Sequence, residues 1–139
     1  MKGILLISHG RLAEGMADSA ALFLGDRIPQ FDWLCLEPGD SAHEFGNRIM
    51  EKASELDTGE GVIVLADICG GTPSNQTIPG LSEKLDLITG VNLSLLVQLL
   101  TEREYGQVSV PELVEAGRKG IMDMKAAMAQ AAGESHDWL

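Results

Sequence analysis

Two ionisable residues stand where short apolar runs of the sequence end. His9 comes shortly after the run Gly-Ile-Leu-Leu-Ile at residues 3–7, and Asp67 directly follows a second run at residues 61–66. In an open α/β sheet, ligands bind beyond the carboxyl ends of the strands, so both side chains are well placed for chemistry. If the two runs are neighbouring strands, the Asp67 carboxylate accepts a hydrogen bond from one ring nitrogen of His9. The other nitrogen is then free to attack an electrophile, which makes His9 a candidate nucleophile.

The loop after Asp67 indicates which electrophile fits. Gly70 and Gly71 remove side chains where backbone amides can face an anion, and a helix start just beyond them adds positive dipole. Thr72 and Ser8 contribute hydroxyl groups. The chain has no G-x-x-x-x-G-K-[ST] loop and no lysine in these segments, so a nucleoside triphosphate site is not supported. A single phosphoryl group fits these residues better.

Each of these features also has a purely structural explanation. A histidine after a strand is commonly a hydrogen-bonded turn residue, Asp67 can cap the turn that follows it, and Gly-Gly-Thr-Pro is a common turn sequence. The joint occurrence at two strand ends favours function, but the residues alone leave both interpretations open. His43 is expected on an exposed helical face and His136 near the chain end, so neither competes with His9.

Composition and charge narrow the classes of protein. The 139 residues, 45% of them hydrophobic, suit one domain, and the net charge of -11 disfavours nucleic acid and anionic membranes as partners. No apolar stretch is long enough to cross a bilayer, so a cytoplasmic location is expected. Cys35 and Cys69 lack the spacing of metal ligands and are expected to be reduced thiols. The residues indicate neither a metal nor a cofactor.

The elements that must position the candidate site alternate along the chain. Strands are predicted at residues 2–8, 31–36, 61–67 and 85–89, because these stretches are short, aliphatic and bounded by turn residues. Helices are predicted at residues 12–24, 41–56, 92–100 and 109–132, with an interrupted helix near residue 74. This alternation predicts a three-layer α/β/α fold with a mainly parallel four-stranded sheet in the order 2-1-3-4. Residues 1–132 are expected to form a single domain and residues 133–139 a loose tail.

Several segments resemble the mannose/fructose/sorbose family of sugar phosphotransferase system (PTS) IIA components. The resemblance lies in Ile-Ser-His-Gly at residues 7–10, Glu-Pro-Gly-Asp at 37–40, the loop at 66–75 and Thr-Gly-Val-Asn-Leu at 89–93. It implies that His9 accepts a phosphoryl group from the phosphocarrier HPr and passes it to the EIIB component, and that Asp67 bonds the ring. Amides of Gly70, Gly71 and Thr72 would then stabilise the phosphoryl oxygens.

The resemblance also bears on partners. Since donor and acceptor are proteins, the site is expected to be shallow, with an apolar rim for docking at Leu12, Met16 and Ile68. Family members are usually homodimers, and the IIC and IID subunits in the membrane, not the IIA component, handle the sugar. Some members exchange a strand near the carboxyl end, but that segment here has a helical pattern, so no exchanged strand is expected.

Two other functions remain open at this point. The phosphotransfer subunit of the dihydroxyacetone kinase system resembles the same family and also uses a histidine, but it serves a soluble kinase. A regulatory module that binds phosphate without covalent transfer would use the same loop. The downstream acceptor distinguishes the first alternative, and a covalent phosphate on His9 distinguishes the second.

Overall fold

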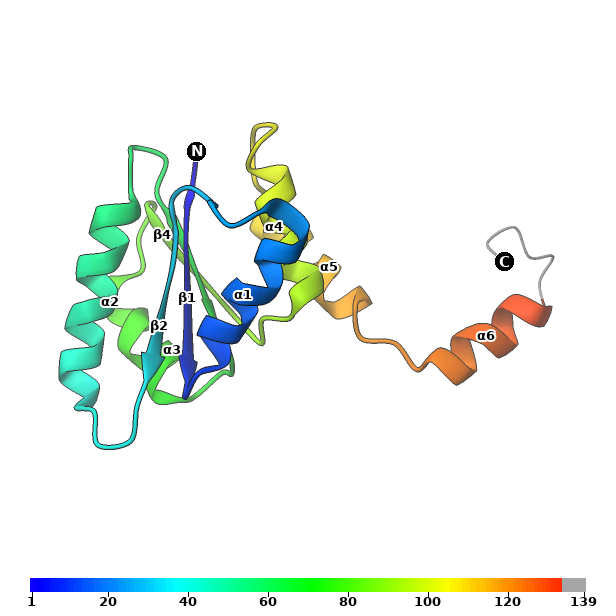
Figure 1. Ribbon diagram of the computed structural model, residues 1–139, viewed down its shortest axis with the longest axis horizontal. Coiled ribbons are helices and arrows are strands. Elements are labelled where there is room, and N and C mark those ends of the chain that lie inside the picture. Colours follow the sequence, from blue (N-terminus) through cyan, green and yellow to red (C-terminus); the bar gives the residue numbers. More distant parts are fainter. Residues whose placement is uncertain (134–139) are drawn as a thin grey trace.

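A four-stranded parallel sheet forms the centre of the molecule (Figure 1). The computed structural model describes residues 1–133, and residues 134–139, which include most of the expected tail, lie outside the described part of the chain. The strand order is β2-β1-β3-β4, and each neighbouring pair is parallel. This confirms the predicted order. The strands are β1 (Gly3–His9), β2 (Phe31–Leu36), β3 (Val62–Ala66) and β4 (Leu85–Thr89).

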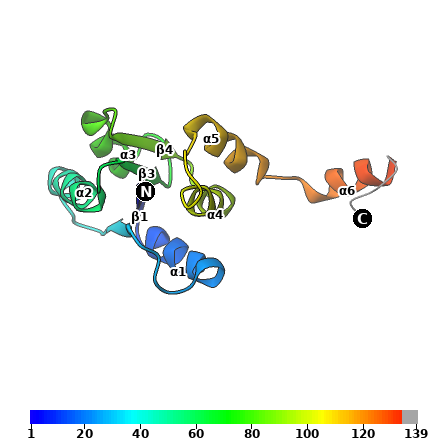
Figure 2. The same ribbon diagram turned by 90° about the horizontal axis from the view of Figure 1, so that it is seen from above.

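Helices cover both faces of this sheet, as Figure 2 shows from above. Successive residues of β1 point to opposite faces, so Ile4 and Leu6 pack with α1 and α4, while Leu5 and Ile7 pack with α2. The three-layer architecture predicted from the sequence is therefore confirmed. The helices are α1 (Leu12–Leu24), α2 (Ala42–Leu56), α3 (Thr72–Thr77), α4 (Leu93–Glu102), α5 (Val110–Lys119) and α6 (Met124–Gly133).

Local capping explains where several of these helices begin. The Ser41 side chain accepts a hydrogen bond from the Glu44 amide at the start of α2, and Ser109 accepts one from the Glu112 amide at the start of α5. Asn92 caps α4 in the same way. The interrupted helix near residue 74 is α3, which is short and is followed by a 3-10 turn, η1 (Ile78–Gly80).

The expected single helix at residues 109–132 is wrong, because the structure contains two helices there. The first, α5, ends at Lys119 and is followed by Gly120, whose amide donates to the carbonyl of Ala116 and whose lack of a side chain weakens the helical conformation. Asp123 then starts α6, because its carboxylate accepts a hydrogen bond from the Ala126 amide. In Figure 1, α6 lies well away from the sheet and its covering helices.

Arg103 joins the amino ends of two strands. It is only 3% exposed, and its guanidinium donates hydrogen bonds to the backbone carbonyls of Lys2, Pro29 and Gln30. Lys2 immediately precedes β1, and Gln30 immediately precedes β2. One buried cation therefore joins the amino ends of β1 and β2, at the side of the sheet opposite to His9. Within residues 1–133, no helix has the length and apolarity needed to cross a membrane.

Candidate functional site

The structure brings His9 and Asp67 together at the carboxyl edge of the sheet. His9 ends β1, and Asp67 directly follows β3, which pairs with β1 so that Ile7 lies opposite Ala66. Nδ1 of His9 lies 2.8 Å from Oδ2 of Asp67, and the backbone amide of His9 donates to the same oxygen at 2.9 Å. One carboxylate oxygen thus holds both the main chain and the ring of the histidine.

The environment of Asp67 keeps its carboxylate charged. Burial alone would raise the pKa of Asp67. Hydrogen bonds from the amide and ring of His9 and from the Ile68 amide lower this pKa by more than burial raises it, so the pKa lies below its ordinary value. Because an ionised carboxylate only accepts hydrogen bonds, Nδ1 of His9 carries the proton. The lone pair of the neutral ring is therefore on Nε2.

The imidazole of His9 is partly open to solvent. The His9 side chain is 45% exposed, whereas the Asp67 side chain is only 8% exposed. No hydrogen-bond partner of Nε2 is found among residues 1–133. The acid is therefore enclosed, while the imidazole ring is partly exposed and its Nε2 has no partner among the described residues.

Gly71 approaches the His9 ring so closely that a side chain would not fit. A Cβ atom placed at Gly71 would lie 2.4 Å from Cε1 and 3.0 Å from Nε2 of His9. In the described part of the chain, the amides of Gly70, Gly71 and Thr72 donate no hydrogen bond. Gly71 therefore lies against the His9 ring, in a loop whose amides at residues 70–72 have no partner among the described residues and can serve an anion.

Two side chains that sequence reasoning did not single out hold this loop. The Ser74 hydroxyl donates to the carbonyl of Gly71, and the Asn75 amide group donates to the carbonyl of Gly70. Both residues belong to the loop segment on which the family resemblance was based. A serine and an asparagine directly after a glycine pair are residues that hydrogen-bond nearby backbone, and this is the signal that could have identified them.

Ser8 has a different position from the one that the sequence suggested. Its side chain is buried, its hydroxyl donates to the carbonyl of Gly10, and its oxygen accepts from the amide of Ala13 at 2.8 Å. The hydroxyl hydrogen is therefore already used. Ser8 caps the first turn of α1 and shapes the turn after His9, instead of presenting a donor at the surface.

The three expected docking residues divide into two groups. Leu12, three residues after His9 in the sequence, is 51% exposed. Ile68, which directly follows Asp67, is 53% exposed. Met16 is half-buried and packs against the core beneath α1. Of the three residues, Leu12 and Ile68 are therefore the two that present a largely exposed apolar side chain.

Comparison with known proteins agrees with the geometry of the site. Residues 3–117 match the family model described as the PTS system fructose IIA component. The chain belongs to this family of PTS IIA components. The match includes His9, Asp67 and the glycine pair, and it ends before α6.

Individual proteins similar to this PTS IIA component are also PTS components. The mannose-specific EIIAB component from Escherichia coli strain K12 is 33% identical over 135 residues, which cover 93% of this chain and 41% of that protein. The chain thus spans about two fifths of the length of that relative. The fructose-specific EIIA component from Bacillus subtilis is 24% identical over 112 residues, covering 76% of this chain and 73% of that protein.

A solved structure shares both the fold and the sequence similarity. The PTS IIA protein associated with the fucose utilization operon of Streptococcus pneumoniae superimposes with a TM-score of 0.85 at 30% identity. The superposition covers 91% of this chain and 96% of that one.

Proposed function

We propose that His9 accepts a phosphoryl group from phospho-HPr and passes it to the EIIB component of a sugar transporter. The observation that carries this proposal is the His9 ring, fixed by Asp67 through Nδ1 and left accessible at Nε2. In the first step, the lone pair of Nε2 forms a bond to phosphorus. The bond between phosphorus and the donor atom breaks, and its electron pair stays with the donor. In the second step, an acceptor atom of EIIB attacks the same phosphorus and Nε2 recovers its lone pair.

The residues around His9 stabilise the charges that this transfer creates. The ring becomes positively charged as Nε2 bonds to phosphorus, and the Asp67 carboxylate compensates that charge through Nδ1. The phosphoryl oxygens are negative, and the unsatisfied amides of Gly70, Gly71 and Thr72 can donate to them. In this proposal, Ser8 positions the turn and does not bind the phosphoryl group.

The partners follow from the same reaction. Leu12 and Ile68 provide the apolar rim on which HPr and EIIB dock in turn, while Met16 supports that rim from below. The sugar is handled by the IIC and IID subunits in the membrane, so the chain acts on it only indirectly and works in the cytoplasm. No cofactor is needed, because the phosphoryl group travels from one protein to the next.

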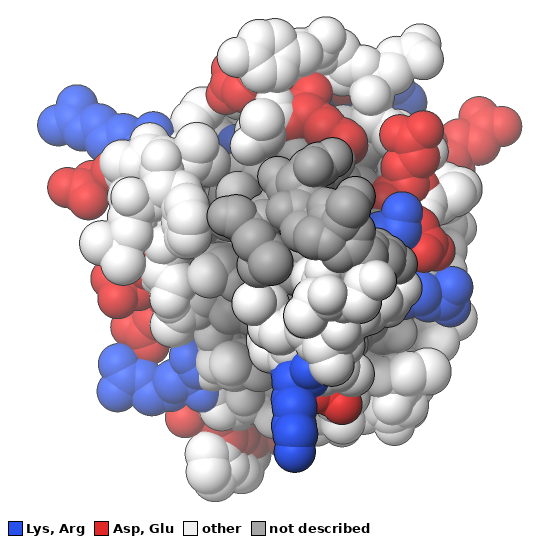
Figure 3. Space-filling model, turned by 90° about the vertical axis from the view of Figure 1, so that its right-hand side faces the viewer, with Lys and Arg blue, Asp and Glu red and all other residues white. Residues whose placement is uncertain are grey.

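A homodimer is also part of the proposal. The helix α6 lies away from the body of the molecule (Figure 1), and Met124 and Met128 are exposed by 54% and 42%. In Figure 3, which views this end of the molecule, most Lys, Arg, Asp and Glu side chains of the described residues lie toward the outline. We propose that residues 1–132 act as one IIA domain, with α6 available for contact with a second copy.

Phosphorylation with purified components tests the proposal directly. The full chain is incubated with enzyme I, HPr and labelled phosphoenolpyruvate, and the acid-labile phosphate is mapped by mass spectrometry. Wild type and His43→Ala should carry the label at residue 9, and His9→Ala should carry none. Label that persists at His43 or His136 in His9→Ala would contradict the assignment. A wild-type chain that binds inorganic phosphate but takes no label would instead support a regulatory module.

Transfer from the labelled chain identifies the acceptor. Labelled wild type is mixed separately with an EIIB component and with the soluble subunits of a dihydroxyacetone kinase. Loss of label to EIIB alone supports the sugar transporter. Loss of label to the kinase subunits alone would show that the chain serves the other system.

A further inference from the structure

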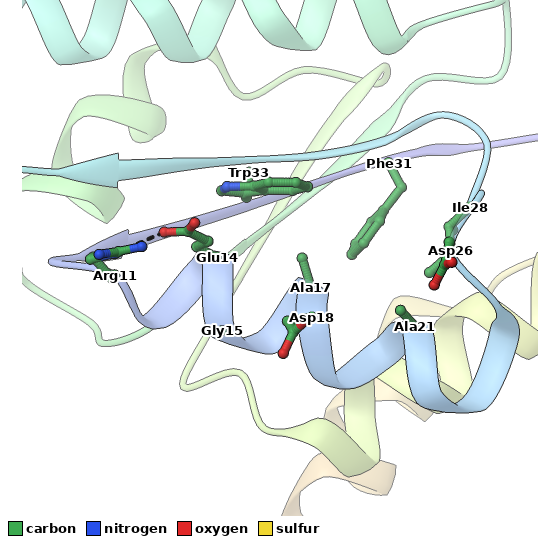
Figure 4. A pocket seen from close by; sticks show the side chains of 10 residues that line it. All are labelled: Arg11, Glu14, Gly15, Ala17, Asp18, Ala21, Asp26, Ile28, Phe31 and Trp33. Atoms are coloured by element: carbon green, nitrogen blue, oxygen red, sulfur yellow. Dashed lines mark hydrogen bonds and ion pairs between the residues drawn. The ribbon is translucent and has the colours of Figure 1, made fainter.

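A groove runs between α1 and β2 and begins beside the catalytic edge of the sheet. Its volume is about 660 Å³, and Figure 4 shows the side chains of Trp33 and Phe31 along its wall. Trp33 is 40% exposed, although it belongs to a strand. Large aromatic side chains with this much exposed surface are typical anchors for a binding partner.

Charge on the other wall of the groove is mainly negative. Glu14, Asp18 and Asp26 line it, and Arg11 is the one cation among the residues that line it. Arg11 is paired with Glu14 at 2.9 Å. Asp18 and Asp26 have no hydrogen-bond or ion-pair partner within residues 1–133. The groove therefore combines an aromatic wall with two uncompensated carboxylates.

The backbone of β2 indicates that side chains, not an added strand, occupy this groove. β2 is an edge strand, and an incoming strand would need its outward amides. The amide of Trp33 is already bonded to the carboxylate of Asp32, which is held in turn by Lys52 at 3.0 Å on the opposite face. Strand addition would have to break this arrangement, whereas side chains can enter the groove without doing so.

The groove also lies next to the site of phosphoryl transfer. Arg11 at its mouth is separated from His9 by one residue, and Leu36 at the end of β2 lies opposite His9 in the sheet. From there the groove extends along α1 toward Asp26 and Ile28 (Figure 4). A protein that places a phosphoryl group on His9 can therefore reach the groove with a neighbouring segment.

We propose that this groove docks a basic and apolar segment of the phosphoryl donor. The inference rests on the function proposed above and adds a second contact area to the rim at Leu12 and Ile68. An apolar side chain of the donor packs on Phe31 and Trp33, and a lysine or arginine reaches Asp18 and Asp26. A second cation of the segment can lie over the indole ring of Trp33, where the aromatic face attracts positive charge.

A phosphoryl donor that is a separate protein must find the chain by diffusion. Complementary charge raises the rate of encounter between proteins, and this effect weakens as salt screens the charges. The chain has a net charge of -11, and the two unpaired carboxylates direct part of that charge toward the path to His9. Docking should therefore appear in the encounter with the donor and not in the chemical step.

Kinetics with graded donor concentration tests the groove in the full chain. The variants are Trp33→Ala and the double variant Asp18→Asn with Asp26→Asn, and the measured reaction is transfer from phospho-HPr to residue 9. We expect kcat/KM for phospho-HPr to fall about tenfold in each variant, with kcat within about twofold of wild type. The rate should also depend less on ionic strength in the double variant than in wild type.

Matched controls carry the same chemical changes elsewhere. Tyr105→Ala removes an aromatic side chain that is 88% exposed, and Glu51→Gln with Glu115→Gln removes two exposed charges from α2 and α5. These variants should retain the wild-type kcat/KM. If the groove variants also retain it, the proposal is overturned. If only transfer to EIIB slows, the groove holds the acceptor and the assignment to the donor is wrong.

Binding measurements separate this inference from the proposed function. Unphosphorylated HPr is titrated into wild type and into the groove variants by calorimetry, which requires no transfer. Weaker binding of HPr to the variants supports the groove even if no label reaches His9. Unchanged binding together with unchanged kinetics would exclude the groove while leaving phosphorylation of His9 intact.

Discussion

The two edges of the central sheet each carry a polar side chain that joins neighbouring segments, and they differ in what they leave open. At the carboxyl edge, Asp67 holds His9 through one ring nitrogen, and the other nitrogen has no partner in the described residues. At the amino edge, Arg103 donates to three carbonyl groups and is 3% exposed. One edge therefore retains an accessible reactive atom, and the other encloses its charge.

An accessible atom without a partner, and not the presence of hydrogen bonds, distinguishes a candidate functional group from a structural one. Both residues cross-link strands by hydrogen bonds, so the presence of such bonds does not identify a site. Burial lowers the pKa of Arg103, but a guanidinium stays protonated in proteins, so this residue neither loses a proton nor offers a lone pair. His9 combines a fixed orientation with a lone pair that a partner can reach. Mutations at the two edges should therefore affect different measurements.

The largest effect is expected on stability, at the amino edge. Arg103→Met leaves the carbonyls of Lys2, Pro29 and Gln30 without their donor and should lower the free energy of unfolding by about 3 kcal/mol. Urea denaturation followed by circular dichroism measures this change. Arg118→Met, at an exposed position of α5, should change it by less than about 0.5 kcal/mol. Equal stability of the two variants would remove the structural role of Arg103.

The next effect is expected on rate, at the carboxyl edge. Asp67→Asn keeps a group that can bond the ring but removes the negative charge that stabilises it during transfer. We expect phosphoryl transfer to His9 to slow by about 100-fold with a native-like fold. Rapid-quench measurement of labelled protein gives the rate, and the circular dichroism spectrum checks the fold. Transfer at the wild-type rate would exclude Asp67 from the mechanism.

A smaller loss of rate is expected at the glycine that covers the ring. In Gly71→Ala the new methyl group would occupy the space of Cε1 of His9, so the ring must move. Because the ring is half-exposed it can shift partly, and transfer should slow by about tenfold. In Gly133→Ala, where nothing lies within 4 Å of the added atom, the rate should remain unchanged. Equal rates in both variants would show that the close approach of Gly71 has no catalytic consequence.

The smallest effect concerns pH. The folded pKa of Asp67 lies below its unfolded value of about 3.9, so this residue adds stability above that pH and loses it as the pH falls through the folded pKa. Between pH 5 and pH 2, the stability of wild type should therefore fall more steeply than that of Asp67→Asn. Urea denaturation across this range measures both slopes. Parallel slopes would show that the hydrogen bonds to Asp67 do not depend on its charge.

The elements whose bounds were predicted well from the sequence are those that short-range residue patterns determine. The helix at residues 12–24 and the strand at residues 85–89 match the observed bounds, because apolar spacing and terminal glycines are local signals. The proximity of His9 and Asp67 also follows from their shared position after adjacent parallel strands. The alternation of strands and helices predicts parallel strands, and parallel pairing brings together two side chains that are 58 residues apart in the sequence.

Other features depend on contacts that no local pattern contains. Arg103 bonds to Lys2 across 101 residues of sequence, and nothing near either residue indicates this pairing. Ser8 was assigned to the phosphoryl group because its type and place fit, but the helix that follows uses its hydroxyl. The break between α5 and α6 departs from the predicted single helix because only two residues separate the Gly120 stop from the Asp123 start, and the sequence on both sides has a helical pattern.

One oxygen of Asp67 makes the proposed phosphoryl transfer depend on the correct alignment of two strands. Oδ2 accepts from both the backbone and the ring of His9, so it joins β1 to the end of β3 in one register. A slip of one residue between these strands would turn the acid to the opposite face and leave the imidazole unanchored. If His9 accepts a phosphoryl group as proposed, misaligned or partly unfolded molecules would fail to receive it, and only correctly folded copies would pass it on.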